Sequence, residues 1–230
     1  MRYLYRSRSG QGGGALLLSS ALVFVILILL LAIAPHLTSM QGWVLLFLLL
    51  SLAIFVGYSK MTEPYYAVEL NEQGVCYHHR RGSWMLPWQA FSFASVPQLN
   101  QVGELSFVSF KVTHYPAFLA NLPLRLAVKL LIEQRSLLIA ALRQNCPTGT
   151  CPSEMILESG DFYVGAVRYH GVLAMFAHRM RHLSVLLGAE LFIPAECLPL
   201  APADFCRVVN RSRLIYMNNR EQLFTGQLLQ

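Results

Sequence analysis

The sequence lacks the residue patterns that usually reveal an enzyme. It has no Ser/His/Asp order, no nucleophile elbow and no conspicuous pair of carboxylates; Glu158 and Asp161 are near each other without a recognisable partner. The glycine-rich stretch 10–14 lacks the preceding strand and the following lysine of a phosphate-binding loop. We therefore expect a protein that is not an enzyme and that uses no cofactor.

Acidic residues are scarce, yet the basic surplus is small. The chain of 230 residues has 18 Lys and Arg against 12 Asp and Glu, a formal net charge of +6. Arg2, Arg6 and Arg8 in the N-terminal tail account for half of this surplus. The remaining excess suits a surface that faces anionic lipid. This excess of basic residues is too small to indicate nucleic-acid binding, which usually requires a dense basic stripe.

Cysteine is also infrequent, and its count is odd. Five cysteines argue against a complete disulfide framework. Cys146 and Cys151 are separated by four residues, whereas redox motifs and zinc knuckles prefer two. We interpret these two as incidental loop thiols, with metal binding as the alternative. Cys197 and Cys206 are expected to behave as small apolar residues.

Charge is completely absent from two long apolar runs, 15–34 and 43–58. At about 1.5 Å per residue the first run spans roughly 30 Å, the thickness of a hydrocarbon core. Pro35 and Gly42 lie in the short break between the runs and predict a tight helical hairpin. A cleaved signal peptide is the alternative, but the first run is too long and a second follows at once.

The placement of basic residues predicts the orientation of this hairpin. Arginines precede the first run, Lys60 follows the second, and the connecting loop has neither Lys nor Arg. Positive residues favour the cytoplasmic side of a membrane. We therefore predict a basic cytoplasmic tail over 1–14, a transmembrane hairpin over 15–60, and both termini in the cytoplasm.

We predict one cytoplasmic α+β domain over 62–217, followed by a flexible tail over 218–230. Short alternating segments predict an antiparallel meander, and longer amphipathic segments predict helices that cover it. The segment 145–165 has the proline and glycine content of a loop, with a short strand possible at 155–158. The expected strands are 66–70, 75–79, 84–88, 91–96, 105–113 and 190–194, and the expected helices are 124–143, 169–187 and 202–210.

One segment of this domain resembles a bacterial pleckstrin-homology-like domain. The pattern is a strand ending in Leu70, then Gly74-Val75, Tyr77, the turn Gly82-Ser83-Trp84, and a strand ending in Trp88. Such domains often follow one or two membrane spans. With the segment Gly171–Leu198, the whole chain also resembles a family of uncharacterised two-span inner-membrane proteins of gammaproteobacteria. The resemblance implies an inner-membrane location and a pleckstrin-like antiparallel sheet with additional C-terminal helices. It implies no activity.

Two basic clusters are the candidate binding residues. Histidines at i and i+4 on one helix have the spacing of zinc ligands, but an arginine stands where a metalloprotease has its glutamate. We interpret this cluster as a solvated basic face, so no metal is expected, although metal binding stays open. The second cluster is a polar hairpin tip or a contact for an anionic headgroup or acidic partner. The candidates are His178, Arg179, Arg181 and His182 in the first cluster, and His78, His79, Arg80 and Arg81 in the second.

These features predict a membrane-anchored cytoplasmic binding domain that recognises a protein partner or an anionic membrane surface. Two alternatives are left open: a membrane-bound metal-dependent enzyme, and a structural subunit of an envelope complex. Trp84 and Trp88 share one face of a predicted strand and are expected to lie in the core. The bilayer and a membrane or cytoplasmic protein are the expected partners.

Overall fold

The computed structural model describes residues 3–6, 12–34, 39–61, 64, 66–99, 103–145 and 158–227. The chain forms two compact units, which are described separately below. One unit is Ser7–Tyr65, and the other joins Met1–Arg6 to Tyr66–Gln230. Cys146 and Cys151 lie outside the described residues, as does most of the segment 155–158 that was considered as a strand.

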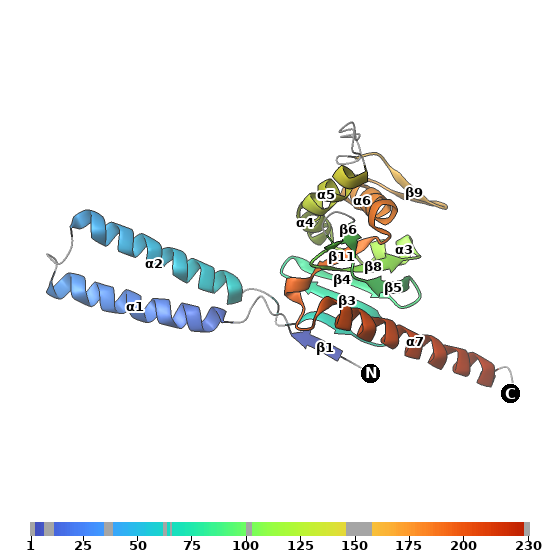
Figure 1. Ribbon diagram of the computed structural model, residues 1–230, viewed down its shortest axis with the longest axis horizontal. Helices are drawn as coiled ribbons and strands as arrows, with labels where there is room; N and C mark the ends of the chain where they lie inside the picture. Colours follow the sequence, from blue (N-terminus) through green and yellow to red (C-terminus); the bar gives the residue numbers. More distant parts are fainter. Residues whose placement is uncertain are drawn as a thin grey trace. The chain divides into compact units, whose positions relative to one another are not determined.

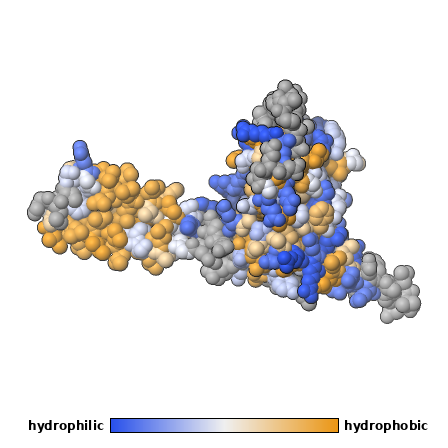
Figure 2. Space-filling view, viewed as in Figure 1, coloured by the Kyte–Doolittle hydropathy of each residue, from blue (hydrophilic) through white to orange (hydrophobic). Residues whose placement is uncertain are grey.

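The first unit is a pair of apolar helices, α1 (Gly13–Ile33) and α2 (Met40–Met61), drawn in blue in Figure 1. Both are long and apolar enough to cross a membrane. Only 6% and 11% of their most apolar windows are buried, so their leucine, isoleucine and phenylalanine side chains cover the outer surface (Figure 2). Water does not favour such a surface, whereas a bilayer does.

Small residues bring the two helices together near their shared end. Gly57 is buried, and a Cβ there would lie 3.1 Å from the backbone nitrogen of Leu17. A Cβ on Gly13 would come within 2.8 Å of the Cβ of Lys60. Close backbone approach at small residues is the usual way in which helices associate within lipid. Ser20 and Ser51 donate their hydroxyls to carbonyls of their own helices.

A four-stranded antiparallel sheet begins the second unit, in the order β1-β2-β3-β4. Strand β1 lies before the apolar helices in the chain and β2 lies after them, yet the two strands pair, with Tyr3 opposite Leu70. The ring of Tyr5 packs edge-on against Phe205 at 5.4 Å. This strand lies within the basic cytoplasmic tail predicted over 1–14, and it was not predicted from the sequence. The strands are β1 (Tyr3–Arg6), β2 (Tyr66–Leu70), β3 (Gly74–His79) and β4 (Gly82–Pro87).

A second antiparallel sheet has the order β11-β8-β5, and two short ribbons accompany it. Its strands confirm the predictions around residues 91–96, 105–113 and 190–194. The β9–β10 ribbon was not expected, because the segment 145–165 reads as loop. The strands are β5 (Phe91–Ser95), β8 (Phe107–Val112) and β11 (Leu191–Pro194), and the ribbons are β6 (Gln98–Leu99) with β7 (Gly103–Glu104) and β9 (Phe162–Val164) with β10 (Val167–Tyr169).

Two of the predicted helices differ in the structure, and the short helix α3 (Tyr115–Leu119) was not predicted. The helix expected over 124–143 is divided at Gln134, because its halves cover different apolar clusters: α4 packs on the main core, and α5 packs with α6 on a smaller one. The last helix does not end near residue 210 but continues to Gln227, through most of the tail predicted over 218–230. The helices are α3 (Tyr115–Leu119), α4 (Leu124–Glu133), α5 (Arg135–Asn145), α6 (Gly171–Leu187), the short 3₁₀ helix η3 (Ala195–Cys197) and α7 (Pro202–Gln227).

One core joins both sheets and the helices around them. Trp84 of β4 lies at its centre, with Phe110 of β8 and Phe118 of α3 packed edge-on against it at 6.0 and 5.7 Å. Both phenylalanines are fully buried. Burying one such side chain contributes roughly 1.5–3 kcal/mol. Trp84 and Trp88 are each 2% exposed, which confirms that both are core residues.

Helix α7 covers the free edge of β5. The Oδ1 atom of Asn210 accepts a hydrogen bond from the Ala94 amide at 2.7 Å, and its Nδ2 atom donates to the Ala94 carbonyl at 2.8 Å. Arg213 donates from Nε to the Phe91 carbonyl at 2.7 Å. These side chains take the place of a neighbouring strand, so that backbone groups of an edge strand are satisfied without another chain.

Candidate functional site

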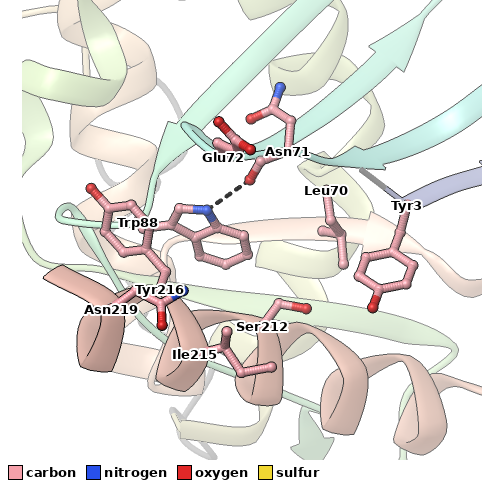
Figure 3. A pocket seen from close by; sticks show the side chains of 9 residues that line it. All are labelled: Tyr3, Leu70, Asn71, Glu72, Trp88, Ser212, Ile215, Tyr216 and Asn219. Carbon is pink, nitrogen blue, oxygen red and sulfur yellow. Dashed lines mark hydrogen bonds between the residues drawn. The ribbon is translucent and has the colours of Figure 1, made fainter. Parts of the chain in front are cut away.

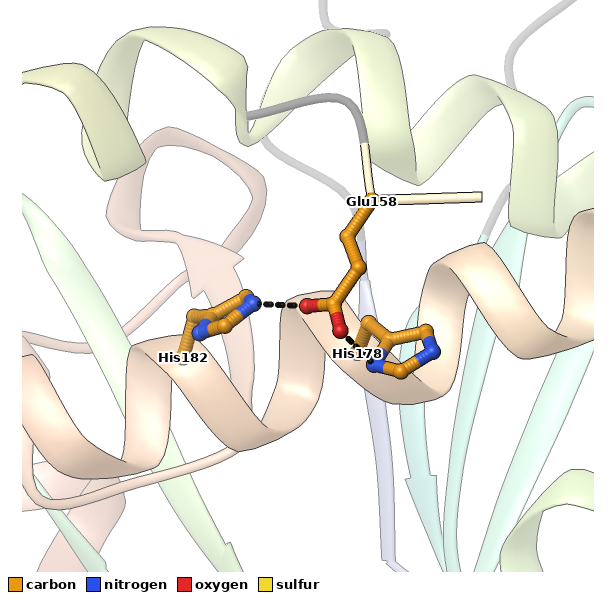
Figure 4. A group of neighbouring side chains, drawn as sticks. All are labelled: Glu158, His178 and His182. Atoms are coloured by element: carbon orange, nitrogen blue, oxygen red, sulfur yellow. Dashed lines mark hydrogen bonds and ion pairs between the residues drawn. The ribbon is translucent and has the colours of Figure 1, made fainter. Parts of the chain in front are cut away.

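Two histidines of α6 converge on one carboxylate. His178 and His182 are one helical turn apart and therefore share a face of α6, and Glu158 approaches from the segment before β9. The distance from His182 Nε2 to Glu158 Oε2 is 2.6 Å, and from His178 Nδ1 to Glu158 Oε1 it is 3.0 Å (Figure 4). One ligand atom from each residue lies within 4.8 Å of the other two. Two imidazoles and a carboxylate are a common metal-binding set.

The ring of His178 is fixed by its surroundings. Its side chain is only 6% exposed, and Phe162 of β9 packs edge-on against it at 4.9 Å. Its Nε2 atom lies 3.1 Å from the Gly160 carbonyl oxygen. A carbonyl only accepts, so Nε2 carries the hydrogen and donates it. The other ring nitrogen, Nδ1, faces Glu158 Oε1.

An arginine enters the same cluster. The Nη2 atom of Arg181 lies 3.1 Å from His178 Nδ1 and 3.3 Å from Glu158 Oε1. Its guanidinium carbon also lies 5.3 Å from the centre of the Phe162 ring. The side chain is half exposed. A positive charge therefore lies beside both the imidazole and the carboxylate, in contact with each.

The expectation of a solvated basic face on α6 is wrong for two of its members, because His178 and Arg179 are each only 5% exposed. Arg179 donates from Nη1 to the Leu131 carbonyl of α4 at 3.4 Å. Burial, with a smaller contribution from the charge of Arg135, lowers the pKa of Arg179 from its ordinary value. Helix packing thus buries residues that the sequence pattern predicts to be exposed.

Aromatic and charged groups from the elements around α6 interact with one another. Tyr115 of α3 stacks on Phe162 at 6.0 Å. Burial and the nearby Glu190 carboxylate raise the pKa of the Tyr115 phenol far above its ordinary value. Glu190, itself almost fully buried, accepts from the Val112 amide at 2.7 Å and from Lys111 Nζ at 3.0 Å. This buried carboxylate ties β8 to the chain after α6.

The second basic cluster surrounds the turn between β3 and β4. His78 faces Glu69 of β2 at 3.5 Å, and His79 faces Glu133 of α4 at 3.7 Å. The two histidines therefore point to opposite sides of the strand, as neighbouring residues of a strand do. Arg80 and Arg81 are exposed in the turn itself. The α6 cluster surrounds a different carboxylate, that of Glu158. The structure therefore brings His178, Arg181 and His182 together, but it does not join all eight predicted residues into one surface.

A cleft lies between α7 and the turn that joins β2 to β3, and sequence patterns alone did not indicate it. Its volume is about 280 Å³. Trp88 forms one wall, donating from Nε1 to the Asn71 carbonyl at 2.9 Å, and its ring lies 6.3 Å from that of Tyr216 (Figure 3). The lining residues are Tyr3, Leu70, Asn71, Glu72, Trp88, Ser212, Ile215, Tyr216 and Asn219.

This cleft depends on contacts that are distant in sequence. Tyr3 comes from β1, and four of the lining residues come from α7 beyond Asn210, where the helix was expected to end. An amphipathic stripe on α7 gives only a weak signal by itself. The cleft could be recognised only once α7 was known to continue past the indole of Trp88.

Three cysteines lie in the described part of the second unit. Cys76, Cys197 and Cys206 are all in the thiol form. Cys206 is buried in the core, as expected of a small apolar residue, and burial raises the pKa of its thiol to about 11. Burial also raises the pKa of Cys76. Thiols held in the protonated form are poor nucleophiles and poor metal ligands.

Comparison with known proteins gives a family for the second unit. No curated protein and no solved structure matches the chain. The family model of DUF2982, described as a protein of unknown function, matches residues 68–214. This range runs from β2 into α7, includes the α6 cluster and most of the cleft, and does not include the two apolar helices. The chain therefore belongs to the DUF2982 family.

Proposed function

We propose that this chain is a membrane-anchored binding protein of the bacterial inner membrane, without catalytic activity. In this proposal α1 and α2 cross the bilayer as a hairpin, and both termini lie in the cytoplasm. The observation that carries it is the pairing of β1 with β2. These strands flank the apolar helices in sequence, so a sheet that contains both requires the two ends of the hairpin to be on one side of the membrane.

The distribution of charge supports a cytoplasmic position for that side. Lys60 closes α2, and the N-terminal tail carries three arginines, whereas the loop between the helices has no Lys or Arg. Positive residues are retained in the cytoplasm during insertion. A pleckstrin-like arrangement is part of the proposal and is supported by two antiparallel sheets that share one core, with α7 packed along the edge of β5.

The cleft beside α7 is the proposed binding surface, and a segment of a partner protein is the proposed ligand. Its walls combine aromatic rings with amide, hydroxyl and carboxylate groups, a mixture that suits a peptide better than a phosphate headgroup. Most basic side chains near the other candidate clusters already face carboxylates, as His79 faces Glu133. Among the candidate basic residues, Arg80 and Arg81 are exposed without a carboxylate partner among the ion pairs of the described residues, and Arg181 is half exposed beside Glu158.

The topology is tested by labelling single cysteines with a membrane-impermeant maleimide in a cysteine-free background. Ser39 lies between the helices and is exposed, and Gln222 is exposed on α7. Ser39→Cys should react in cells whose inner membrane is intact. Gln222→Cys should react only after that membrane is permeabilised. The opposite pattern, or equal labelling of both, contradicts the proposed orientation.

The binding surface is tested by photo-cross-linking in native membranes. A photoreactive amino acid at Ile215, which is 39% exposed and lines the cleft, should give a discrete protein adduct. The matched control is Val185 on α6, which is 80% exposed and outside the cleft. Adducts of equal yield at both positions would argue against a specific cleft. Adducts with lipid alone would shift the ligand to the membrane surface, to be examined by Arg80→Glu/Arg81→Glu in vesicle binding.

A further inference from the structure

Glu158, His178 and His182 have the chemistry and the arrangement of a metal site. Imidazole nitrogen and carboxylate oxygen are the donors that Zn²⁺ accepts together, with one coordination position left for water. Two donors come from successive turns of α6 and one from the segment before β9, so the site would join two parts of the fold. Both histidine side chains are nearly enclosed, at 6% and 11% exposed.

The hydrogen bonding of His178 gives a second, independent indication. Its Nε2–H is committed to the Gly160 carbonyl, the arrangement by which proteins orient a ligating histidine and fix its tautomer. Its Nδ1 atom lies 3.0 Å from a carboxylate oxygen and 3.1 Å from Arg181 Nη2, and a guanidinium only donates, so Nδ1 acts as an acceptor. Two neighbouring acceptors repel each other unless a cation lies beside both. In the structure, the guanidinium of Arg181 supplies that cation.

We propose that Glu158, His178 and His182 bind a divalent transition-metal cation, with Zn²⁺ as the representative ion, and that Arg181 occupies this position when the metal is absent. Ligand atoms in a tetrahedral zinc site lie roughly 3.3 Å apart, given bonds of about 2.0–2.1 Å. The Glu158 oxygens lie slightly closer than this to the two imidazoles. Glu158 is one-third exposed, so a small rotation of its side chain opens the required space.

Metal and Arg181 compete for the same ligands. The guanidinium is half exposed and can turn into solvent when the ion enters. Two positive charges a few ångströms apart repel each other strongly in a partly buried site. Removing the charge at position 181 therefore increases metal affinity, whereas removing a ligand abolishes binding. The opposite directions of these two effects distinguish a metal site from a purely structural ion-pair cluster.

The test uses the full-length protein purified in detergent, stripped with a chelator and titrated with Zn²⁺ against a chromophoric competitor. Wild-type protein should bind one equivalent. His178→Ala and Glu158→Gln should lose it, and Arg181→Gln should bind about tenfold more tightly. The matched control is His170→Ala, because His170 is an exposed histidine at the start of the same helix and its side chain makes no capping bond.

Replacement of zinc by Co²⁺ separates this site from binding by thiols. A nitrogen- and oxygen-ligated cobalt centre gives visible ligand-field bands without the sulfur-to-metal charge-transfer band that cysteine ligands produce. These bands should be present in wild-type protein and His170→Ala, stronger at low cobalt in Arg181→Gln, and absent in His178→Ala. Failure of both wild-type protein and Arg181→Gln to bind either ion, or retention of binding by His178→Ala, overturns the proposal.

Discussion

The pairing of β1 with β2 predicts that the apolar hairpin is an insertion into a β-turn and can be replaced by one. Arg6 and Tyr66 are partners at the end of the ladder, so a two-residue Asn-Gly turn is long enough to connect them. A variant in which residues 7–65 are replaced by this turn should be a soluble, folded monomer. A second variant that begins at Tyr66 lacks β1 and exposes the edge of β2.

The difference in stability between these two variants follows from what β1 contributes. The aromatic contact of Tyr5 with Phe205 at 5.4 Å is worth about 0.5–1.5 kcal/mol beyond its burial. The ladder adds about 1–2 kcal/mol net, because the freed groups of β2 regain hydrogen bonds with water. The free energy of unfolding in urea should therefore be about 1.5–3.5 kcal/mol lower for the variant without β1, a large share of the stability of an ordinary domain.

Point substitutions within the turn-linked variant supply the control. Tyr5→Ala should lose about 2 kcal/mol, since the side chain is only partly buried. Leu4→Ala on the same strand should change little, because Leu4 is 42% exposed. Equal urea midpoints for the variants with and without β1, or equal effects of the two substitutions, would refute the assignment of β1 to this sheet.

Three further predictions concern packing and reactivity. Asn210→Leu removes both hydrogen bonds to Ala94 and buries an N–H without an acceptor, so urea unfolding should show a loss of about 2–4 kcal/mol; a loss below about 0.5 kcal/mol would show that the edge of β5 does not need this cap. Gly57→Leu forces a side chain against the Leu17 backbone and should lower the thermal stability of the full-length protein in detergent, by about 1–3 kcal/mol, whereas unchanged stability would mean that the helices do not meet there. Burial keeps the Cys206 thiol protonated up to a pKa of about 11, so mass spectrometry should show far slower alkylation at pH 8 in folded than in urea-unfolded protein, and equal rates would contradict the burial.

Local patterns predicted most of the individual elements. Alternating apolar residues marked the strands around Trp84 and Phe110, and apolar residues at helical spacing marked α6, with Gly188 ending it in a left-handed conformation (φ 80°). These signals depend on residues close together in the chain. These signals can therefore be recognised without knowing which partners each element packs against.

The errors arose where a distant partner decides the outcome. Tyr3–Arg6 becomes a strand only because β2 offers an edge after an intervening pair of apolar helices. Gln134 divides a long helical pattern because two apolar clusters lie in different directions. The spacing of His178 and His182 was visible in the sequence. Their common carboxylate, Glu158, is separated from them in the chain by the β9–β10 ribbon. Without that partner, the sequence pattern of a buried cluster indicates a solvated face.

The order in which the chain is synthesised gives the pairing of β1 with β2 a further consequence. Strand β1 leaves the ribosome first, but its partner follows only after both apolar helices have been made. In the proposed topology, the sheet therefore closes only when β1 and β2 lie on the same face of the bilayer. If only one of the two helices crossed the membrane, β1 and β2 would lie on opposite faces. The unpaired edge of β2 would then be open to aggregation or proteolysis. Completion of the sheet would thus act as a proofreading step for membrane insertion.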